Sequence, residues 1–379
     1  VDDERAGQVA AALAARPLND PMAYAFYARK GSQTARAIFA SYPGQHPEAN
    51  LTSDEFRVIM ARMFGIPPAA LRDVVGYAIP RASTNGVVDE HGYTLTAAKV
   101  PGPTDKRRHD YVKHVLHTLL RAYRIEAQLE PDQLFMSQLS AEQIARETRG
   151  SGAGIIPDIV ADGTAQTIVE IKVIGAVHTY SQRKQTEPNV CTNSVETRQR
   201  QVHRDYPRRA NNLDREQGHG DTSLDDVNTT PNEWYEASPQ NWGAVRRRLA
   251  EFRLRGCVAG PRGEISADFR KIIKEAAALG AVRLRDRLPV ENPRMAEAVL
   301  RWHANCRIGM AIQKASARHL LDRIAMVRRG GRTDDGANDA ATSATFGSEG
   351  PDAAVDAHRT VHYADHTGAT PWRDIGVGD

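Results

Sequence analysis

The sequence predicts a mixed α/β fold, with a mixed central sheet flanked by helices and further helical segments at both ends of the chain. Three observations predict it. Two short β-branched runs stand on either side of a turn signal within residues 155–175. A further apolar run with strand character lies at 254–259. Long stretches with apolar residues at helical spacing precede and follow these runs.

Residues 1–103 are expected to form a helical N-terminal region. A cap at Thr52 or Ser53 precedes apolar residues that recur at i, i+3, i+4 and i+7, and Pro67-Pro68 interrupts the pattern. This spacing predicts an amphipathic helix with a core-facing stripe of Phe56, Ile59, Met60 and Met63.

A boundary is expected near residues 100–103, where two prolines and a glycine break the pattern. A helix then runs from Thr104 to about Tyr123, with an apolar stripe of Val112, Val115, Leu116, Leu119 and Leu120. Alternation over residues 125–129 predicts a first strand, and residues 140–148 predict a short helix.

The remaining elements follow the hairpin of residues 155–175. We expect an arginine-rich helix over 195–210, a long mobile loop over 211–240, a helix over 241–252 and a strand from Leu254 to Ala259. The predicted order of elements over residues 104–262 is therefore an α-β-β-β-α-β core, with one extra helix before its last strand.

The sequence predicts two further helices after this core. One runs from about Ser266 to Leu279, and another starts at Pro293 and ends near Arg329, so 263–329 form a C-terminal helical region. Residues 330–379 contain few apolar side chains and predict a disordered tail.

Composition excludes several classes of protein. The chain has 379 residues, 41% hydrophobic and 26% charged, which is typical of a globular protein with more than one domain. No run of about 18 apolar residues indicates a membrane span. Its three cysteines lie far apart, which favours free thiols and an intracellular setting, in the nucleus or the cytoplasm.

Positive charge is concentrated in two segments, although the net charge is only +3. Arginines gather in residues 196–215 and 244–255. Clustered arginine is typical of phosphate binding, and a solvated helix face is the alternative for each segment.

Three charges interrupt the apolar runs: Asp158 in the first, Glu170 and Lys172 in the second. An unpaired buried charge would cost several kcal/mol, so these charges need a purpose. Side chains alternate along a strand, so Glu170 and Lys172 point the same way. Asp158 shares their face only if the loop between the strands has an odd number of residues.

We therefore predict a loop of three or five residues in place of a two-residue Asp162-Gly163 turn. A loop centred on Thr164 sets Asp158 directly opposite Glu170. Two carboxylates so placed repel each other, and a hard divalent cation, Mg²⁺ or Mn²⁺, resolves the conflict. The expected ligands are Asp158, Glu170 and the backbone carbonyl of Ile171, and Lys172 would position the attacking water.

Pro157-Asp158 followed by Glu170-Ile171-Lys172 resembles the signature of the PD-(D/E)XK nuclease superfamily, which has a restriction-endonuclease-like fold. The predicted element order over Thr104–Gly260 is similar to the core of that superfamily. The resemblance implies a Mg²⁺-dependent phosphodiester hydrolase with Asp158 and Glu170 as metal ligands and Lys172 as the catalytic lysine. It implies a nucleic acid as the partner, with DNA favoured over RNA, and a role in a mobile element or in genome maintenance. A homodimer is left open.

Members of this superfamily often add one more carboxylate ligand. Asp110, Glu126 and Glu130 are the candidates, and the sequence does not choose among them. One exonuclease-like branch carries a glutamine four residues before a tyrosine. Here that position holds Val202, four before Tyr206, so this branch is not assigned.

Three arginines recur every four residues on the helix that would flank the site: Arg200, Arg204 and Arg208. They would clamp phosphates, or line a solvated helix face.

Two other functions remain open. One is a nucleic-acid-binding protein that keeps the fold without cleavage. The other is a structural or interaction protein in which Lys172 only pairs with Glu170 or Asp158.

Overall fold

The computed structural model describes residues 32–82, 86–148, 155–175, 190–219, 242–290 and 292–330, with four isolated positions nearer the N-terminus. The expected tail over 331–379 lies outside these residues, as does most of the expected loop over 211–240.

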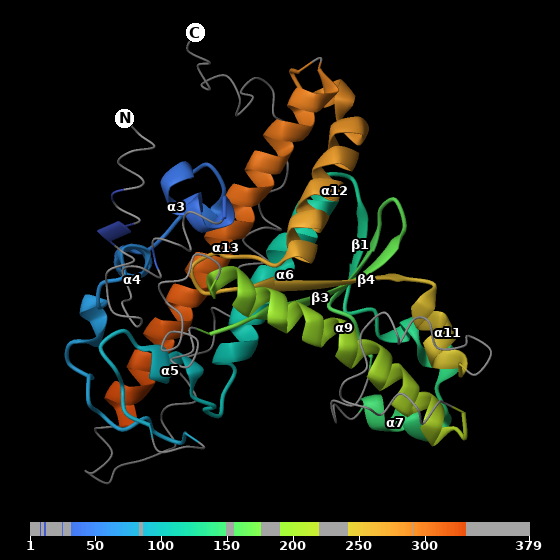
Figure 1. The fold of residues 1–379 in the computed structure, drawn as a ribbon, viewed down its shortest axis with the longest axis horizontal. Coiled ribbons are helices and arrows are strands. Elements are labelled where there is room, and N and C mark those ends of the chain that lie inside the picture. Colours follow the sequence, from blue (N-terminus) through green and yellow to red (C-terminus); the bar gives the residue numbers. More distant parts are fainter. Residues whose placement is uncertain are drawn as a thin grey trace. The chain divides into compact units, whose positions relative to one another are not determined.

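The fold is mixed α/β, built around an open four-stranded sheet with the order β1-β2-β3-β4 (Figure 1). The strands are β1 (Glu126–Leu129), β2 (Ile159–Asp162), β3 (Gln166–Val173) and β4 (Arg253–Ala259). Strand β2 is antiparallel to both β1 and β3, and β4 runs parallel to β3. A parallel neighbour requires a long crossover connection, and the chain between β3 and β4 contains the longest helix on that face of the sheet, α9.

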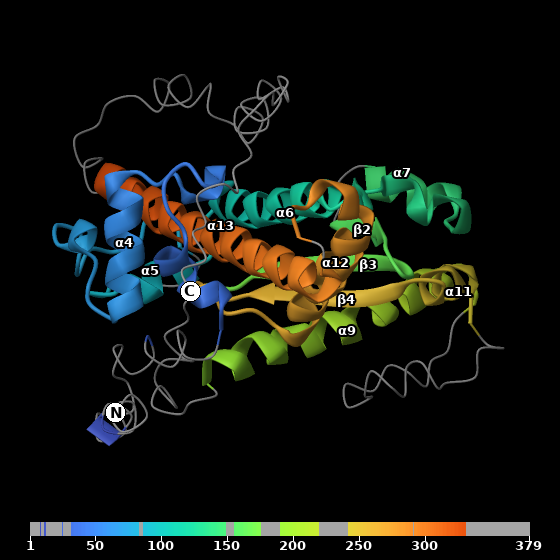
Figure 2. The same cartoon turned by 90° about the horizontal axis from the view of Figure 1, so that it is seen from above.

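Helices cover both faces of this sheet. Figure 2 shows α9 on one side of β3 and β4, with α6 and α13 on the other. The helices are α3 (Ala37–Ala40), α4 (Ser53–Phe64), α5 (Tyr93–Ala97), α6 (Thr104–Ala122), α7 (Ala141–Thr148), α9 (Val190–Glu216), α11 (Ala244–Ala250), α12 (Ala267–Arg283) and α13 (Pro293–Gly330).

Alternate residues of the strands fill two separate hydrophobic clusters. Val169 and Ile171 pack with α6, α12 and α13, whereas Ile168 and Leu254 pack with α9 and α11. Burial of both faces explains why β3 is a nearly continuous apolar run and not a simple alternation.

Helix α13 joins two parts of the molecule. Its first half packs in the cluster with α6 and α12, and its second half packs with α4 and the residues that follow α4. Residues 1–331 form one compact unit. The divisions of the chain at 103/104 and 262/263 stay predictions. Helix α13 contributes to the hydrophobic cluster formed with α6 and to the one formed with α4, so it packs on both sides of the first division.

A close approach fixes α13 against the N-terminal segment. A Cβ atom at Gly309 would lie 2.2 Å from the carbonyl oxygen of Thr34 and 2.5 Å from the Cβ of Ala37. Only glycine leaves room for that backbone, so the segment Thr34–Arg36 can lie directly on the helix.

The predicted helix from Thr104 is confirmed, and all five residues of its apolar stripe are buried. The predicted stripe of the helix after Thr52 is wrong in part. Thr52 and Glu55 form the cap, but Phe56 is 48% exposed and the buried side carries Val58 in its place. The stripe shifts by one residue because the polar Glu55 and Arg62 side chains are buried with hydrogen-bond partners of their own.

The predicted end of the arginine-rich helix near residue 210 is also wrong. Helix α9 continues through Pro207 to Glu216, so 211–216 are not part of a loop. Leu213 is buried against α11, and the carboxylate of Asp214 accepts the N–H groups of Val245 (2.9 Å) and Arg246 (3.0 Å) at the start of α11. Packing against α11, and the use of Asp214 to cap the start of α11, extend α9 beyond its periodic pattern.

Strand β1 forms one edge of the sheet and is short. Arg124 and Glu130, which flank it, have positive φ angles of 59° and 43°. The left-handed conformation turns the chain out of the extended path at both ends, so the strand stops after four residues.

Among the described helices, none is both long and apolar enough to cross a bilayer. Cys257 and Cys306 are buried free thiols, as predicted for these two cysteines.

Candidate active site

The turn between β2 and β3 sets the geometry of the site. Strand β2 ends at Asp162 and β3 begins at Gln166, so the loop has three residues and is centred on Thr164. Ile159 pairs with Val169, and the same register places Asp158 opposite Glu170. The predicted odd-length loop is confirmed.

Asp158 and Glu170 are both buried at this point of the sheet. Asp158 Oδ2 accepts the backbone N–H of Ile171 at 2.7 Å, which ties the acid to the strand that carries Glu170. Lys172 Nζ donates to Glu170 Oε1, so the three predicted side chains lie on one face of the hairpin.

Burial and the negative charge of Asp158 both raise the pKa of Glu170 above its usual value, although Lys172 and Tyr206 act against this rise. Two carboxylates this close in a buried place hold excess negative charge. The pair therefore attracts cationic groups.

His109, from the first turns of α6, lies against Asp158. Its Nε2 lies 3.2 Å from Asp158 Oδ2 and 3.0 Å from the carbonyl oxygen of Ile171, and its Nδ1 lies 3.2 Å from Asp110 Oδ1. A carbonyl can only accept, so Nε2 carries a proton. Burial lowers the pKa of His109, but Asp158 and Asp110 together raise it above its usual value.

Tyr206, from α9, completes the surroundings of Glu170. Its hydroxyl donates to Glu170 Oε2 at 2.8 Å. Burial raises the pKa of Tyr206 well above its usual value, and the charge of Glu170 acts in the same direction, so the phenol stays protonated and can donate. The charge of Arg209, one turn further along α9, opposes the rise.

A glycine in β4 allows α9 to come this close. Gly256 pairs with Glu170 across the parallel strands. A Cβ atom on Gly256 would lie 3.2 Å from the Cβ of Val202 and 3.3 Å from the carbonyl oxygen of Gln199. The missing side chain lets α9 lie against the sheet, which brings Tyr206 to Glu170.

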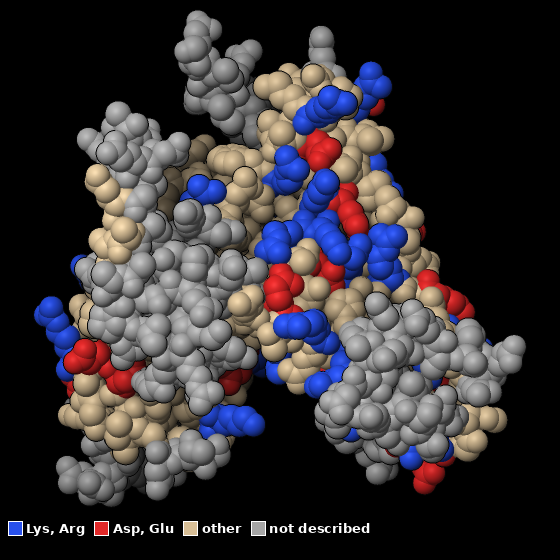
Figure 3. Space-filling view, viewed as in Figure 1, with Lys and Arg blue, Asp and Glu red and all other residues tan. Residues whose placement is uncertain are grey.

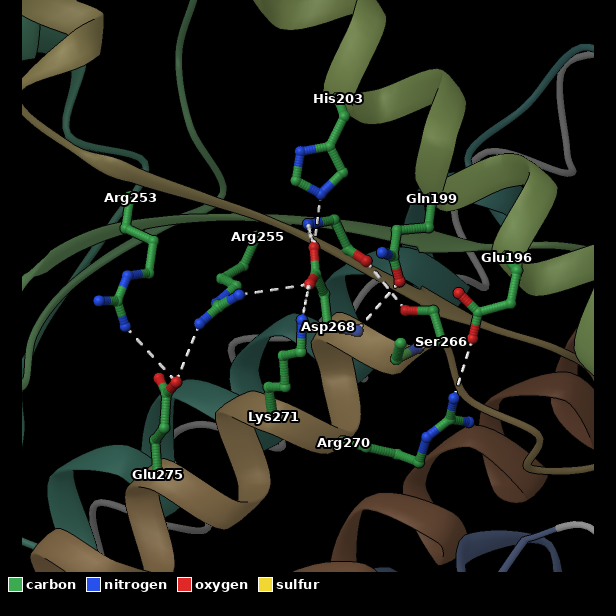
Figure 4. Close-up of polar contacts among 12 residues, drawn as sticks. Glu196, Gln199, His203, Arg253, Arg255, Ser266, Asp268, Arg270, Lys271 and Glu275 are labelled. Atoms are coloured by element: carbon green, nitrogen blue, oxygen red, sulfur yellow. Dashed lines mark hydrogen bonds and ion pairs between the residues drawn. The ribbon is translucent and has the colours of Figure 1, made fainter. Parts of the chain in front are cut away.

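Polar contacts lock α9 and β4 onto the start of α12 (Figure 4). Asp268, in the first turn of α12, accepts from His203 Nε2 (2.5 Å) and from the N–H of Gly256 (3.0 Å). Gln199 Oε1 accepts the N–H of Asp268 at 3.0 Å. Acidic side chains at a helix N-terminus are favourable, so this cluster fixes three elements around the site.

The three candidates for a further carboxylate ligand lie apart from the Asp158–Glu170 pair. Asp110 reaches it only through His109, and it also accepts from Lys113 Nζ at 2.9 Å. Glu130 pairs with Lys113, and its backbone N–H donates to the carbonyl of Asp158. Glu126 is exposed at the far end of β1.

The arginines predicted to clamp phosphates lie on the outer sides of α9. Arg200 and Arg208 are exposed, and within the described ranges neither forms an ion pair. Arg204 lies 3.7 Å from the neighbouring carboxylate of Asp205. Two of these three side chains are thus available to an anion.

Lys and Arg side chains also gather over α12 and beside β4, with Asp and Glu side chains among them (Figure 3). Arg255 pairs with Glu275 at 2.9 Å, and Arg270 pairs with Glu196 at 2.9 Å. Much of the positive charge on this surface is therefore neutralised within the protein.

The donor atoms suit a hard cation, although they do not enclose one. Asp158 Oδ2 and the Ile171 carbonyl are oxygen ligands of the kind that bind Mg²⁺, and here both lie within hydrogen-bond distance of His109 Nε2. Over the described ranges, no three His, Cys, Asp or Glu side chains are grouped so as to hold a metal ion.

His109 and Tyr206 are the site residues that the sequence analysis missed. His109 lies three residues before Val112, in phase with the buried stripe of α6, and Tyr206 lies four residues after the buried Val202. A polar residue in phase with an apolar stripe is the signal that could have found both.

Comparisons with protein-family models, with known proteins and with solved structures found no match to this chain.

Proposed function

We propose that this protein is a metal-dependent nuclease that hydrolyses phosphodiester bonds, with DNA favoured over RNA as the substrate. Its site would be similar to that of the PD-(D/E)XK superfamily. The observation that carries the proposal is the register of the β2–β3 hairpin. It sets Asp158 opposite Glu170, with Lys172 on the same face and the Ile171 carbonyl beside them.

In this proposal Asp158, Glu170 and the carbonyl of Ile171 would hold Mg²⁺ or Mn²⁺. Such a cation, when bound, lowers the pKa of a water and neutralises charge on a phosphodiester. Lys172 is half-buried, so its ammonium can leave Glu170 and donate to a phosphate oxygen. Tyr206 holds Glu170 in place, and His109 holds Asp158 and the Ile171 carbonyl.

The test is incubation with plasmid, single-stranded and branched DNA, with and without Mg²⁺ or Mn²⁺. We expect cleavage only with the cation, and a loss of at least about 100-fold in Asp158→Ala and in Lys172→Ala. Lys106→Ala, with a side chain 78% exposed on α6, is the control and should cleave normally. Circular dichroism checks that each variant is folded. Full cleavage by Lys172→Ala would end the proposal.

A second candidate is a nucleic-acid-binding protein without cleavage. It is favoured by the protein donors that already occupy both acids, namely Ile171 N–H and His109 on Asp158, and Lys172 and Tyr206 on Glu170. It predicts binding that needs no divalent cation and weakens steeply with salt, with no product from any DNA.

A further inference from the structure

Four arginine side chains, three of them buried and one half-buried, come from different parts of the chain and lie close together beside the N-terminal helices. The arginine cluster consists of Arg62 from α4, Arg108 from α6, Arg262 from the β4–α12 connection and Arg323 from α13. Arg62, Arg262 and Arg323 are 7%, 3% and 1% exposed. Burial of a guanidinium is unfavourable unless a counter-charge accompanies it.

Two members of the cluster, Arg262 and Arg62, donate hydrogen bonds to neutral oxygen atoms. Arg262 Nε donates to the backbone carbonyl of Arg62 at 3.2 Å, and its Nη2 donates to the hydroxyl of Tyr93 at 2.9 Å. Arg62 Nη1 donates to the carbonyl of Ser316 at 2.9 Å. In the described part of the chain, the Arg62 guanidinium forms no ion pair with a carboxylate, although the charge of the buried Glu264 raises the pKa of Arg62.

Asp105 contacts the other two members of the cluster. Asp105 lies 3.3 Å from Arg108 Nη2, 2.9 Å from Arg323 Nη2 and 2.9 Å from His319 Nε2. Asp105 thus faces two guanidinium groups and an imidazole, and Arg323 also interacts electrostatically with Asp322.

Several donor atoms of the cluster are not used. Arg62 Nε, Arg108 Nε and Arg323 Nη1 are buried and have no hydrogen-bond partner among the described residues. Buried donors without partners are rare in folded proteins, and they indicate a missing acceptor.

The cluster members also act on one another electrostatically. Burial, together with the charges of Arg262 and Arg108, lowers the pKa of Arg62 to about 10, although Tyr93 and Glu264 act to raise it. Burial and the charge of Arg323 lower the pKa of Arg108, although Asp105 raises it. An anion placed among these groups would relieve that repulsion.

We propose that the arginine cluster binds a phosphate group, with Arg62 and Arg108 as its direct donors. A phosphate offers several acceptor oxygens, and the planar guanidinium matches them with parallel N–H bonds. The unused Nε atoms of the two arginines supply donors that the protein itself leaves without acceptors.

The position of the cluster relates it to the candidate active site. Arg108 directly precedes His109 in α6. A Cβ atom on Gly175 would lie 3.7 Å from Arg108 Nη1. Gly175 comes three residues after Lys172, at most about 10 Å along an extended chain. If the proposed function is correct, the phosphate belongs to the strand of nucleic acid that also reaches Lys172.

The anion site is tested without any cleavage. Thermal unfolding of the full chain is followed in EDTA while inorganic phosphate replaces chloride at constant ionic strength. We expect the Tm to rise by several °C with a saturable dependence on phosphate, because a ligand that binds only the folded state stabilises it. No rise at any phosphate concentration would overturn the proposal, whatever the outcome of the nuclease assay.

Matched variants connect this effect to the cluster. Arg62→Leu and Arg108→Leu should each weaken phosphate binding at least tenfold. Arg57→Leu on α4 and Lys106→Ala on α6, with side chains 71% and 78% exposed, should bind as the wild type does. If Arg62→Leu does not fold, Arg62→Lys and Arg108→Leu decide the question. Unchanged binding in Arg108→Leu would overturn the assignment.

A second arm separates the two sources of the phosphate. Oligonucleotides with and without a 5′-phosphate are compared in EDTA by fluorescence anisotropy, using wild type and Arg108→Leu. Binding to both that is lost equally in Arg108→Leu assigns a backbone phosphate. A preference for the phosphorylated end that disappears in Arg108→Leu assigns a terminal phosphate. Binding of inorganic phosphate alone assigns a small phosphate ligand, and in that case the nucleic acid proposal must stand on its cleavage assay.

Discussion

Glu170 shows how individual side chains define the candidate site. It is a buried acid next to a second acid, and Lys172 and Tyr206 each supply a donor to one of its oxygens. Removing either donor leaves negative charge in a place where burial already disfavours it.

Tyr206→Phe should therefore destabilise the protein and impair the site together. We expect the free energy of unfolding to fall by about 1–3 kcal/mol, because a buried charged acceptor loses its partner. Cleavage should fall by about tenfold, since Glu170 is no longer fixed. Urea unfolding and a plasmid assay measure the two effects.

Tyr123→Phe is the matched control for that variant. The Tyr123 hydroxyl donates to the carbonyl of Leu300 at 2.6 Å, away from Glu170. Its loss should lower the free energy of unfolding by a similar amount and leave cleavage unchanged. If Tyr206→Phe were to cleave as the wild type does, Tyr206 would be a structural residue only.

The sequence could predict the meeting of Asp158, Glu170 and Lys172, because all three lie on one hairpin and side-chain alternation relates them. It could not predict His109 or Tyr206 as neighbours of these acids. Their contacts depend on how α6 and α9 pack on opposite faces of the sheet, and helical periodicity gives only the side of each helix that is buried.

At the scale of elements, the contact between α13 and the segment at Thr34 depends on Gly309. Alanine at this position would favour the helix by about 1 kcal/mol. It would also place a methyl group 2.2 Å from the Thr34 carbonyl oxygen, which the backbone cannot accept without moving.

We expect Gly309→Ala to lower the free energy of unfolding by about 1–3 kcal/mol, since overpacking outweighs helix propensity here. Chemical denaturation gives the value. Stabilisation by this substitution would mean that the segment Thr34–Arg36 does not lie on α13 in solution.

The elements themselves were predicted best where periodicity is strong. The helix from Thr104 and the strand to Ala259 are confirmed within one or two residues. The error at the end of α9 has a tertiary cause, because Leu213 and Asp214 are used by α11. The error at Phe56 arose because Glu55 and Arg62 are buried polar residues, which an apolar pattern does not count.

At the scale of the whole molecule, stability should depend on pH through His303. Burial, and then the charges of Arg307 and His46, lower its pKa to about 4. The unfolded chain binds a proton near pH 6.5, whereas the folded chain does not. His303 therefore contributes stability that is present above pH 6.5 and is lost as the pH falls towards 4.

We expect His303→Gln to remove this part of the pH dependence. The wild type should lose roughly 3 kcal/mol more than the variant between pH 7 and pH 4. Urea unfolding of both proteins at several pH values measures the difference. Parallel curves for the two proteins would show that His303 has an ordinary pKa in the fold.

The left-handed residues on either side of β1 have a consequence for association between copies of the protein. The outer rim of a sheet offers free N–H and C=O groups that can recruit another chain and start aggregation. Here Arg124 and Glu130 limit that rim to four residues. A second molecule joining there would gain only a few backbone bonds, so growth of an extended intermolecular sheet from this rim is discouraged.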